Sequence, residues 1–172
     1  MRQEIEFTLI YNRHKTQLYN YALKMTKDRM IAGDIIQSAF EKFYLNMQGI
    51  IKAESARYWL FTTVRNLVYE HFRRQKIRLA EDITEVELSD EYSNPDVIFE
   101  AKELKQSVNE SIDKLGADLK EVFVLKEYGG LSYEEIAAAL SIEEKLVKSR
   151  LFNARRKLLK ILSGKIKNRQ EY

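Results

Sequence analysis

The residues best suited to bind a ligand lie near the carboxyl end, where cations, hydroxyls and an aromatic ring share one helical face. Between residues 145 and 169 the sequence holds ten Lys and Arg and no Asp or Glu. At helical spacing this face collects Lys145, Lys148, Ser149, Phe152 and Arg156, with Asn153 at its edge. Cations and hydroxyls can contact phosphates, and Arg, Asn, Ser and an exposed Phe can read base edges or a thymine methyl group. The pattern predicts binding of nucleic acid. The alternative is a solvated basic face on an ordinary bundle helix.

The elements that must position this face form a helix-turn-helix pattern. The opposite side of the basic helix is apolar at spacings of four, three and four residues: Val147, Leu151, Ala154 and Leu158. Before it, Ser132 followed by Glu135 forms a capping box, which predicts the start of a preceding helix. The small residues 137–139 let a second helix cross closely, and the short turn 141–143 connects the two. In this motif the second helix enters the major groove of DNA.

A second candidate surface lies on the segment 57–74, where aromatic residues alternate with Arg and Asn. One side carries Leu60, Val64 and Leu67. The other side carries Tyr58, Thr62, Arg65, Asn66, Tyr69 and Arg73, with Trp59 at the margin. Aromatic rings beside cations form a stacking platform that suits unstacked single-stranded bases. Packing of the aromatic side chains in a core is an equally weighted alternative.

A third candidate surface is a small acidic patch near residue 34. The buried side of this predicted helix is formed by Ile36, Ala39, Phe40, Phe43 and Met47. The other side gathers Asp34, Gln37, Ser38 and Glu41. Such a patch on a basic domain could dock an Arg-rich protein surface, but spacing alone favours simple solvation.

The composition limits the fold and function classes. The chain has 172 residues, 45% of them hydrophobic, with one Pro, six Gly and no Cys. These values predict an all-α protein and exclude a disulfide scaffold, thiolate metal sites and cysteine catalysis. No run approaches the roughly 20 apolar residues of a membrane span, and the acidic first residues do not resemble a signal peptide. We expect a cytoplasmic protein that does not insert into membranes.

Segmental charge divides the chain into two helical domains. Residues 1–79 hold 14 Lys and Arg against 7 Asp and Glu, residues 80–100 hold eight acids and no base, and residues 101–172 hold 15 bases against 11 acids. We expect domains at 1–79 and 95–172 joined by an acidic linker at 80–94, with Asn94-Pro95-Asp96 starting the next helix. A short edge strand at 83–88 is the alternative. The predicted helices cover 3–26 (with a possible internal break), 29–47, 55–77, 95–114, 117–128, 132–140 and 143–165.

Five short motifs occur in a specific order. The first domain carries Asp34-Ile-Ile-Gln-Ser-Ala-Phe40 and Trp59-Leu-Phe-Thr-Thr-Val-Arg-Asn-Leu67, followed by Arg73-Arg74. The second carries Leu119-Lys-Glu-Val-Phe-Val-Leu125, Leu131-Ser-Tyr-Glu-Glu-Ile-Ala137 and Val147-Lys-Ser-Arg-Leu151 with Ala154-Arg155. An acidic segment separates the motifs of the first domain from those of the second. With the motifs in this order, nearly the whole chain resembles the extracytoplasmic-function (ECF) class of bacterial sigma factors, which belongs to the sigma-70 family.

The resemblance implies a division of labour between regions 2 and 4 of such factors. Region 2 would bind the clamp helices of the polymerase β′ subunit through Asp34, Gln37, Phe40 and Glu41. The segment 46–54 and then Tyr58, Trp59, Arg65, Asn66, Tyr69 and Arg73 would open and capture the minus-ten element. Region 4 would contact the β flap and bind the minus-thirty-five element through Lys145, Lys148, Ser149, Arg150, Phe152, Asn153 and Arg156.

The resemblance also implies partners rather than catalysis. The expected partners are core RNA polymerase, promoter DNA and an anti-sigma factor, with the acidic linker threading toward the RNA-exit channel. The polymerase performs the nucleotidyl chemistry, so we expect no catalytic residue, no metal and no cofactor in this chain.

Four positions depart from the family pattern. Gly116 replaces a usual Leu-Pro, Leu146 replaces a common Thr, and Asn153 replaces a frequent Arg, which leaves the promoter base at that position open. Ser141 stands where the turn usually has Gly. Either Ser141 adopts a left-handed conformation or it caps the following helix with Glu144.

Two other function classes compete with this interpretation. An autonomous helix-turn-helix regulator would explain residues 115–169 but would leave the aromatic helix and the acidic patch unused. A helical interaction protein would show no salt-sensitive affinity for DNA. An enzyme is the weakest alternative, because His14 and His71 lack ligand spacing and His71 lies on an apolar helix side.

Overall fold

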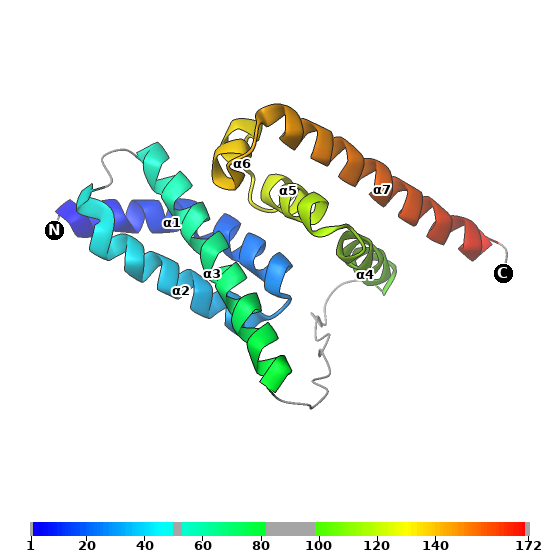
Figure 1. Cartoon of the computed structure of the whole chain (residues 1–172), viewed down its shortest axis with the longest axis horizontal. Helices are drawn as coiled ribbons and strands as arrows, with labels where there is room; N and C mark the ends of the chain where they lie inside the picture. The colour runs from blue at the N-terminus through cyan, green and yellow to red at the C-terminus, as the bar shows by residue number, and fades with distance from the viewer. Residues whose placement is uncertain (1, 50–52, 82–98, 171–172) are drawn as a thin grey trace. The chain divides into compact units, whose positions relative to one another are not determined.

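All regular secondary structure in the described part of the chain is helical, which confirms the predicted all-α class (Figure 1). The computed structural model describes residues 2–49, 53–81 and 99–170. The described helices fall into two compact units, α1 to α3 and α4 to α7. The predicted linker at 80–94 and the helix start at residues 94–96 lie outside the described residues, except that α3 includes residues 80 and 81. Among the helices that are described, none combines the length and apolarity needed to cross a membrane.

The first unit is a three-helix arrangement of α1 (Arg2–Thr26), α2 (Arg29–Asn46) and α3 (Ala53–Glu81), with a 3-10 turn at Met47–Gly49. The helix α1 runs without the break that the sequence left open. Between α1 and α2, Lys27 adopts a left-handed conformation with φ of 60°. Asp28 then caps α2, because its Oδ1 accepts hydrogen bonds from the backbone N–H groups of Met30 at 2.8 Å and Ile31 at 3.0 Å.

The core of the first unit is rich in aromatic side chains. Its fully buried large side chains come from all three helices: Leu18 and Tyr21 of α1, Phe43 of α2, and Leu60, Phe61, Val64 and Val68 of α3. The ring centroids of Tyr21 and Phe61 lie 6.3 Å apart. Burial of each such side chain stabilises the fold by about 1.5–3 kcal/mol. This core fixes which side of α2 and α3 remains outside.

The second unit consists of α4 (Phe99–Asp113), α5 (Ala117–Glu127), α6 (Tyr133–Leu140) and α7 (Glu144–Gln170). The helix α7 packs against α4, α5 and α6. Its core gathers Ile112, Val122, Leu125, Ile136, Val147 and Leu151, all at most 1% exposed. The gaps between helices include Gly116, Gly129-Gly130 and Ser141, as the sequence predicted, and the middle gap is wider by residues 128 and 132.

Candidate nucleic-acid and protein-binding surfaces

The turn between α6 and α7 has the geometry of a helix-turn-helix. The predicted capping box is confirmed: Ser132 Oγ accepts from the Glu135 N–H at 3.1 Å, and Glu135 Oε2 accepts from the Ser132 N–H at 2.7 Å. At the other end of α6, Ser141 is left-handed, with φ of 53° and ψ of 45°. The N–H groups of Ser141 and Ile142 donate to the carbonyls of Ala138 and Ala137, at 3.2 and 3.0 Å. These two bonds form a Schellman motif. Of the two alternatives for Ser141, the left-handed one holds.

The inner side of α7 is the predicted one. Val147, Leu151, Ala154 and Leu158 are all buried, at 8% exposure or less. Because these four residues share one stripe, the remaining sides of α7 are turned away from the core. The apolar stripe therefore sets which residues of α7 can meet a ligand.

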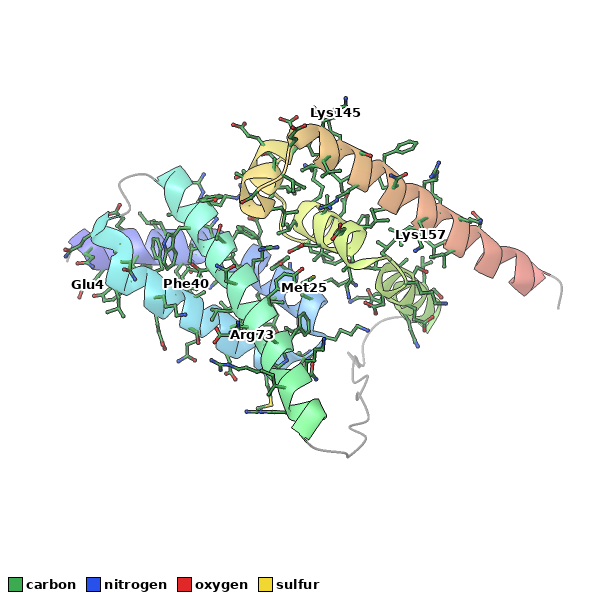
Figure 2. All side chains as sticks on the ribbon, in the orientation of Figure 1. Glu4, Met25, Phe40, Arg73, Lys145 and Lys157 are labelled. Atoms are coloured by element: carbon green, nitrogen blue, oxygen red, sulfur yellow. The ribbon has the colours of Figure 1, made fainter. Side chains whose placement is uncertain are left out.

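The outer side of α7 presents the residues that the sequence assigned to nucleic acid. Asn153 is half-buried. The five other predicted side chains of this face are exposed: Lys145, Lys148, Ser149, Phe152 and Arg156. Phe152 is 64% exposed, which is a large apolar area for a side chain without a covering element in the described chain. Figure 2 labels Lys145 at the start of this helix and Lys157 further along it. The surface combines cations, a hydroxyl, an amide and a ring.

One cation of this surface already has an acidic neighbour. Lys148 Nζ lies 2.6 Å from Glu144 Oε1, one turn earlier on α7, and both side chains are exposed. The hydrogen bond and charge of Glu144 raise the pKa of Lys148 above its usual 10.5. Lys148 therefore stays protonated at neutral pH, and a phosphate that binds Lys148 must replace or share the Glu144 contact.

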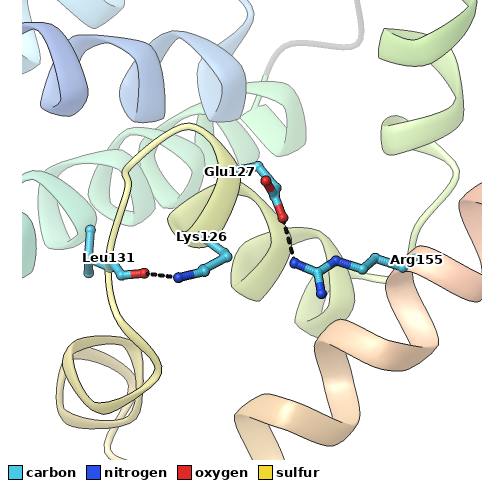
Figure 3. Close-up of polar contacts among 4 residues, drawn as sticks. All are labelled: Lys126, Glu127, Leu131 and Arg155. Atoms are coloured by element: carbon cyan, nitrogen blue, oxygen red, sulfur yellow. Dashed lines mark hydrogen bonds and ion pairs between the residues drawn. The ribbon is translucent and has the colours of Figure 1, made fainter.

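Two ion pairs join α7 to α5. Arg150 Nη2 donates to Asp118 Oδ2 at 2.5 Å. Arg155 Nη2 donates to Glu127 Oε1 at 2.8 Å (Figure 3). The bond with Glu127 raises the pKa of Arg155. Beside this pair, Lys126 Nζ donates to the Leu131 carbonyl at 3.0 Å (Figure 3). This bond connects α5 to the segment that leads into α6. Arg150, predicted to contact DNA, is thus engaged within the fold, and its side chain is 23% exposed.

The helix α3 divides its aromatic residues between core and surface. Phe61 is buried, whereas Tyr58 and Tyr69 are 45% and 39% exposed. Trp59 is half-buried, with its ring centroid 5.8 Å from that of Phe43 on α2. The predicted face is therefore present, with Asn66 and Arg73 exposed and Arg65 half-buried (Arg73 is labelled in Figure 2).

Arg65 and Tyr69 meet on this face of α3. The guanidinium carbon of Arg65 lies 4.9 Å from the Tyr69 ring centroid, which is a cation–π contact. A ring and a cation held side by side can stack on a base and approach its phosphate. Part of the segment 46–54, also predicted to contact the minus-ten element, lies outside the described residues.

The helix α2 exposes its acidic side and buries its aromatic one. Asp34, Gln37 and Glu41 are exposed, and Gln37 Nε2 donates to Glu41 Oε1 at 2.9 Å. Phe40, predicted to contact the polymerase, is only 3% exposed, because its ring packs 4.7 Å from that of Tyr11 on α1. The structure thus places Phe40 within the first unit, beneath the acidic patch.

A groove beside the acidic patch was missed by sequence reasoning. It has a volume of about 790 Å³ and is lined by Phe7, Tyr11 and Tyr19 of α1 and by residues of α2 from Gly33 to Leu45. Tyr44 and Leu45 are 40% and 80% exposed. The exposed Leu45 could have been noticed on the helical wheel of α2, but its pairing with α1 depends on tertiary packing.

Family models cover most of both units. The model of Sigma-70 region 2 matches residues 10–77, and the model of Sigma-70 region 4 matches residues 105–158. The first match contains the acidic patch of α2 and the aromatic face of α3. The second contains α5, α6 and the outer face of α7.

Two curated sigma factors are similar to this chain over most of its length. The ECF RNA polymerase sigma factor SigL of Mycobacterium tuberculosis is 32% identical over 150 residues, which cover 87% of this chain and 84% of SigL. The ECF RNA polymerase sigma-E factor of Escherichia coli is 34% identical over 135 residues, covering 71% of this chain and 69% of the relative.

Two solved structures share the fold. The sigma factor RpoE of Bartonella quintana, crystallised with the anti-sigma factor NepR, has a TM-score of 0.69 at 22% identity and covers 93% of this chain and 96% of RpoE. CnrH, in complex with the cytosolic domain of CnrY, has a TM-score of 0.68 at 22% identity and covers 94% of this chain and 90% of CnrH.

Proposed function

The chain belongs to the ECF class of the sigma-70 family of RNA polymerase sigma factors, and we propose that its described surfaces divide the work of promoter recognition between them. As a sigma factor it binds core RNA polymerase, recognises and melts promoter DNA and directs the initiation of transcription. It is not an enzyme, because the polymerase carries out the nucleotidyl transfer. The observation that carries the proposal is the face of α7, which exposes cations and a phenyl ring opposite a buried apolar stripe.

The face of α7 is proposed to bind the minus-thirty-five element. Lys145, Lys148 and Ser149 would contact phosphates or base edges near the start of the helix, and Phe152, Asn153 and Arg156 would contact bases further along. Arg150 contributes in this proposal by holding α7 against Asp118. The support is the exposure of the first set and the ion pair of Arg150.

The face of α3 is proposed to capture unstacked bases of the minus-ten element. Tyr58, Trp59 and Tyr69 would stack on bases, while Arg65, Asn66 and Arg73 would contact backbone or base edges. Opening a duplex costs a few kcal/mol for each unstacked step, and binding of the extruded bases offsets that cost. The exposed rings of Tyr58 and Tyr69 support the proposal.

The acidic side of α2 is proposed to dock the polymerase. Asp34, Gln37 and Glu41 would bind the β′ clamp helices, and Phe40 would support them from the core. We place region 2 at residues 1–79, the linker at 80–94 and region 4 at 95–172, with region 4 also contacting the β flap. Two sites on one tethered chain gain from effective concentration, so each unit can bind weakly alone.

An anti-sigma factor is the proposed inhibitory partner. The two solved relatives were each captured with a partner: RpoE with the anti-sigma factor NepR, and CnrH with the cytosolic domain of CnrY. A protein that covers the acidic side of α2 and the face of α7 would block both polymerase and DNA. We propose that the chain binds either the anti-sigma factor or the polymerase, and that both bind it in the cytoplasm, where the polymerase acts.

Run-off transcription tests the proposal. Purified core polymerase from the source bacterium is combined with this chain and genomic promoter fragments. We expect discrete transcripts that require the chain, and their start sites would define both promoter elements. Duplex binding by the chain alone, without transcripts, would instead indicate an autonomous regulator. If neither transcripts nor DNA binding are observed and the native core is not retained in a pull-down, the chain is an interaction protein of another kind.

A further inference from the structure

Three neighbouring side chains on the outer face of α7 form one ordered group. The guanidinium carbon of Arg156 lies 5.8 Å from the ring centroid of Phe152, one turn earlier. Arg156 Nη2 also donates to Asn153 Oδ1 at 3.3 Å. Phe152 and Arg156 are exposed and Asn153 is half-buried. The guanidinium is therefore held from two sides while it remains open to a ligand.

The position of this group on the helix decides what it can meet. Leu151, Ala154 and Leu158 are buried on the inner side of α7, so Arg156 leaves the helix on nearly the opposite side. Arg150 and Arg155 instead pair with Asp118 and Glu127 of α5. Among these three arginines of α7, Arg156 is the one directed away from α5.

An oriented guanidinium matches bidentate acceptors, of which DNA offers a guanine edge and a phosphate. Guanine presents O6 and N7 side by side in the major groove, and the planar fork of Arg matches this pair with two parallel hydrogen bonds. A contact with a phosphate tolerates many orientations of the cation. The exposed Lys145 and Lys148 on the same face already provide such contacts. Stacking on Phe152 and bonding to Asn153 reduce the rotamer entropy that Arg156 loses on binding.

We propose that Arg156 reads one guanine of the upstream promoter element through its O6 and N7 atoms, with Asn153 and Phe152 as positioning residues. The inference rests on the proposed role of α7 in binding that element. It assigns a base preference to this chain from the contacts of its own side chains. Asn153 and Phe152 thus act through Arg156, in addition to the base contacts proposed for them.

The test uses holoenzyme reconstituted from the full chain and its native core polymerase. Each guanine of the upstream element is replaced in turn by 7-deazaguanine, which lacks the N7 acceptor, and the affinity is measured by filter binding at several salt concentrations. For the wild-type chain we expect one position at which the replacement weakens binding about 2-fold to 12-fold, because one of the two hydrogen bonds of the bidentate contact is lost. In Arg156→Ala this penalty should vanish, whereas replacement of the other guanines should have the same effect as with the wild-type chain.

Matched variants separate base reading from charge. Lys157→Ala removes an exposed cation adjacent to Arg156, so it should preserve the 7-deazaguanine penalty (Figure 2). Arg156→Lys keeps the charge but loses the planar fork, so its penalty should fall between those of the wild-type chain and Arg156→Ala. Asn153→Ala should reduce the penalty without changing the dependence of affinity on salt. Asn153→Asp keeps an acceptor oxygen for Arg156. It should restore the ratio between the affinities for the unmodified and the 7-deazaguanine site, whatever its overall affinity.

Distinct results overturn the proposal. If all guanine penalties are the same in the wild-type chain and in Arg156→Ala, Arg156 reads no guanine. If Arg156→Ala instead lowers the salt slope by about one without changing any base penalty, Arg156 contacts a phosphate. Unchanged melting temperatures of the variants exclude misfolding. If the wild-type holoenzyme shows no promoter-specific binding, the proposed role of α7 fails as well. If transcription is retained but no 7-deazaguanine replacement weakens binding, only the inference about Arg156 is rejected.

Discussion

Arg150 on α7 donates a hydrogen bond to Asp118 on α5 at 2.5 Å, joining residues that are 32 positions apart in the sequence. A second pair, Arg155 with Glu127, joins the same two helices at 2.8 Å. The core packing of α7 contributes most of the stability, because pairs near the surface add only about 0–1 kcal/mol. The two pairs nevertheless restrict how α7 crosses α5, and hence where the outer face of α7 points.

Replacing Arg150 tests whether this residue positions α7 or touches DNA. We expect Arg150→Ala to weaken binding of the minus-thirty-five element by a few-fold and to leave its salt slope unchanged, because the lost contact is with Asp118. The double variant Arg150→Asp with Asp118→Arg restores a pair and should recover affinity. Filter binding across a range of salt concentrations measures both quantities. A slope reduced by about one would indicate a direct phosphate contact instead.

Lys148 and Glu144 should have opposite effects on DNA binding. Lys148→Ala is expected to weaken binding to all duplexes and to lower the salt slope by about one, since one phosphate contact is lost. Glu144→Gln is expected to strengthen binding, because it releases Lys148 and removes a negative charge from the DNA-facing side. Lys105→Ala, an exposed cation on α4, is the matched control. Equal effects of the Lys105 and Lys148 variants would contradict the assignment.

The ion pair of Lys148 also predicts a pH range. Glu144 raises the folded-state pKa of Lys148 above 10.5, so Lys148 keeps its charge below 10.5 and loses it only as pH rises through that higher value. DNA binding should therefore show no loss attributable to Lys148 between pH 7 and 9. Titration of wild-type and Lys148→Arg chains over this range checks the point, and diverging curves would argue against it.

The left-handed Ser141 predicts a stabilising substitution. A non-glycine residue in this conformation costs about 1 kcal/mol, so Ser141→Gly should raise the free energy of unfolding by roughly 0.5–1 kcal/mol. Ser163 lies within α7, where Gly is a poorer helix former than Ser, so Ser163→Gly should lower that free energy by about 0.5 kcal/mol. Thermal denaturation followed by circular dichroism compares the two. Destabilisation by both variants would speak against strain at Ser141.

Substitutions on the acidic side of α2 and of the buried residue beneath it should have different effects. Asp34→Ala is expected to impair binding of core polymerase while the melting temperature stays unchanged, because Asp34 is exposed. Phe40→Ala should destabilise the first unit by about 3–5 kcal/mol, as expected for a truncated buried ring. A polymerase pull-down and a melting curve on each variant distinguish the two. Full retention of Asp34→Ala in the pull-down would reject its role.

Tyr69 should act after the closed complex has formed. Tyr69→Ala is expected to reduce promoter opening by the loss of one stacked base, about 1–3 kcal/mol, whereas Tyr69→Phe keeps the ring and should behave like the wild-type chain. Permanganate footprinting of the minus-ten element measures opening. If the Phe variant were as defective as the Ala variant, the hydroxyl rather than stacking would be responsible.

Local patterns in the sequence predicted most of the fold. The spacing of Val147, Leu151, Ala154 and Leu158 identified the inner side of α7, and Ser132 with Glu135 identified the start of α6. Such signals are reliable because they depend on contacts within four residues along one helix. Predicted helix boundaries were less accurate, as α3 continues to Glu81 and α7 to Gln170, because helix ends lack a periodic signal.

The sequence by itself determined the two helical units, the inner and outer sides of α7, and the family to which the chain belongs. Only the tertiary structure decided that Arg150 meets Asp118, that Phe40 packs against Tyr11 under the acidic patch, and that Ser141 is left-handed. The reason is physical. Periodicity and capping act over one or two helical turns, whereas an ion pair or a ring contact between helices exists only once packing has brought distant segments together.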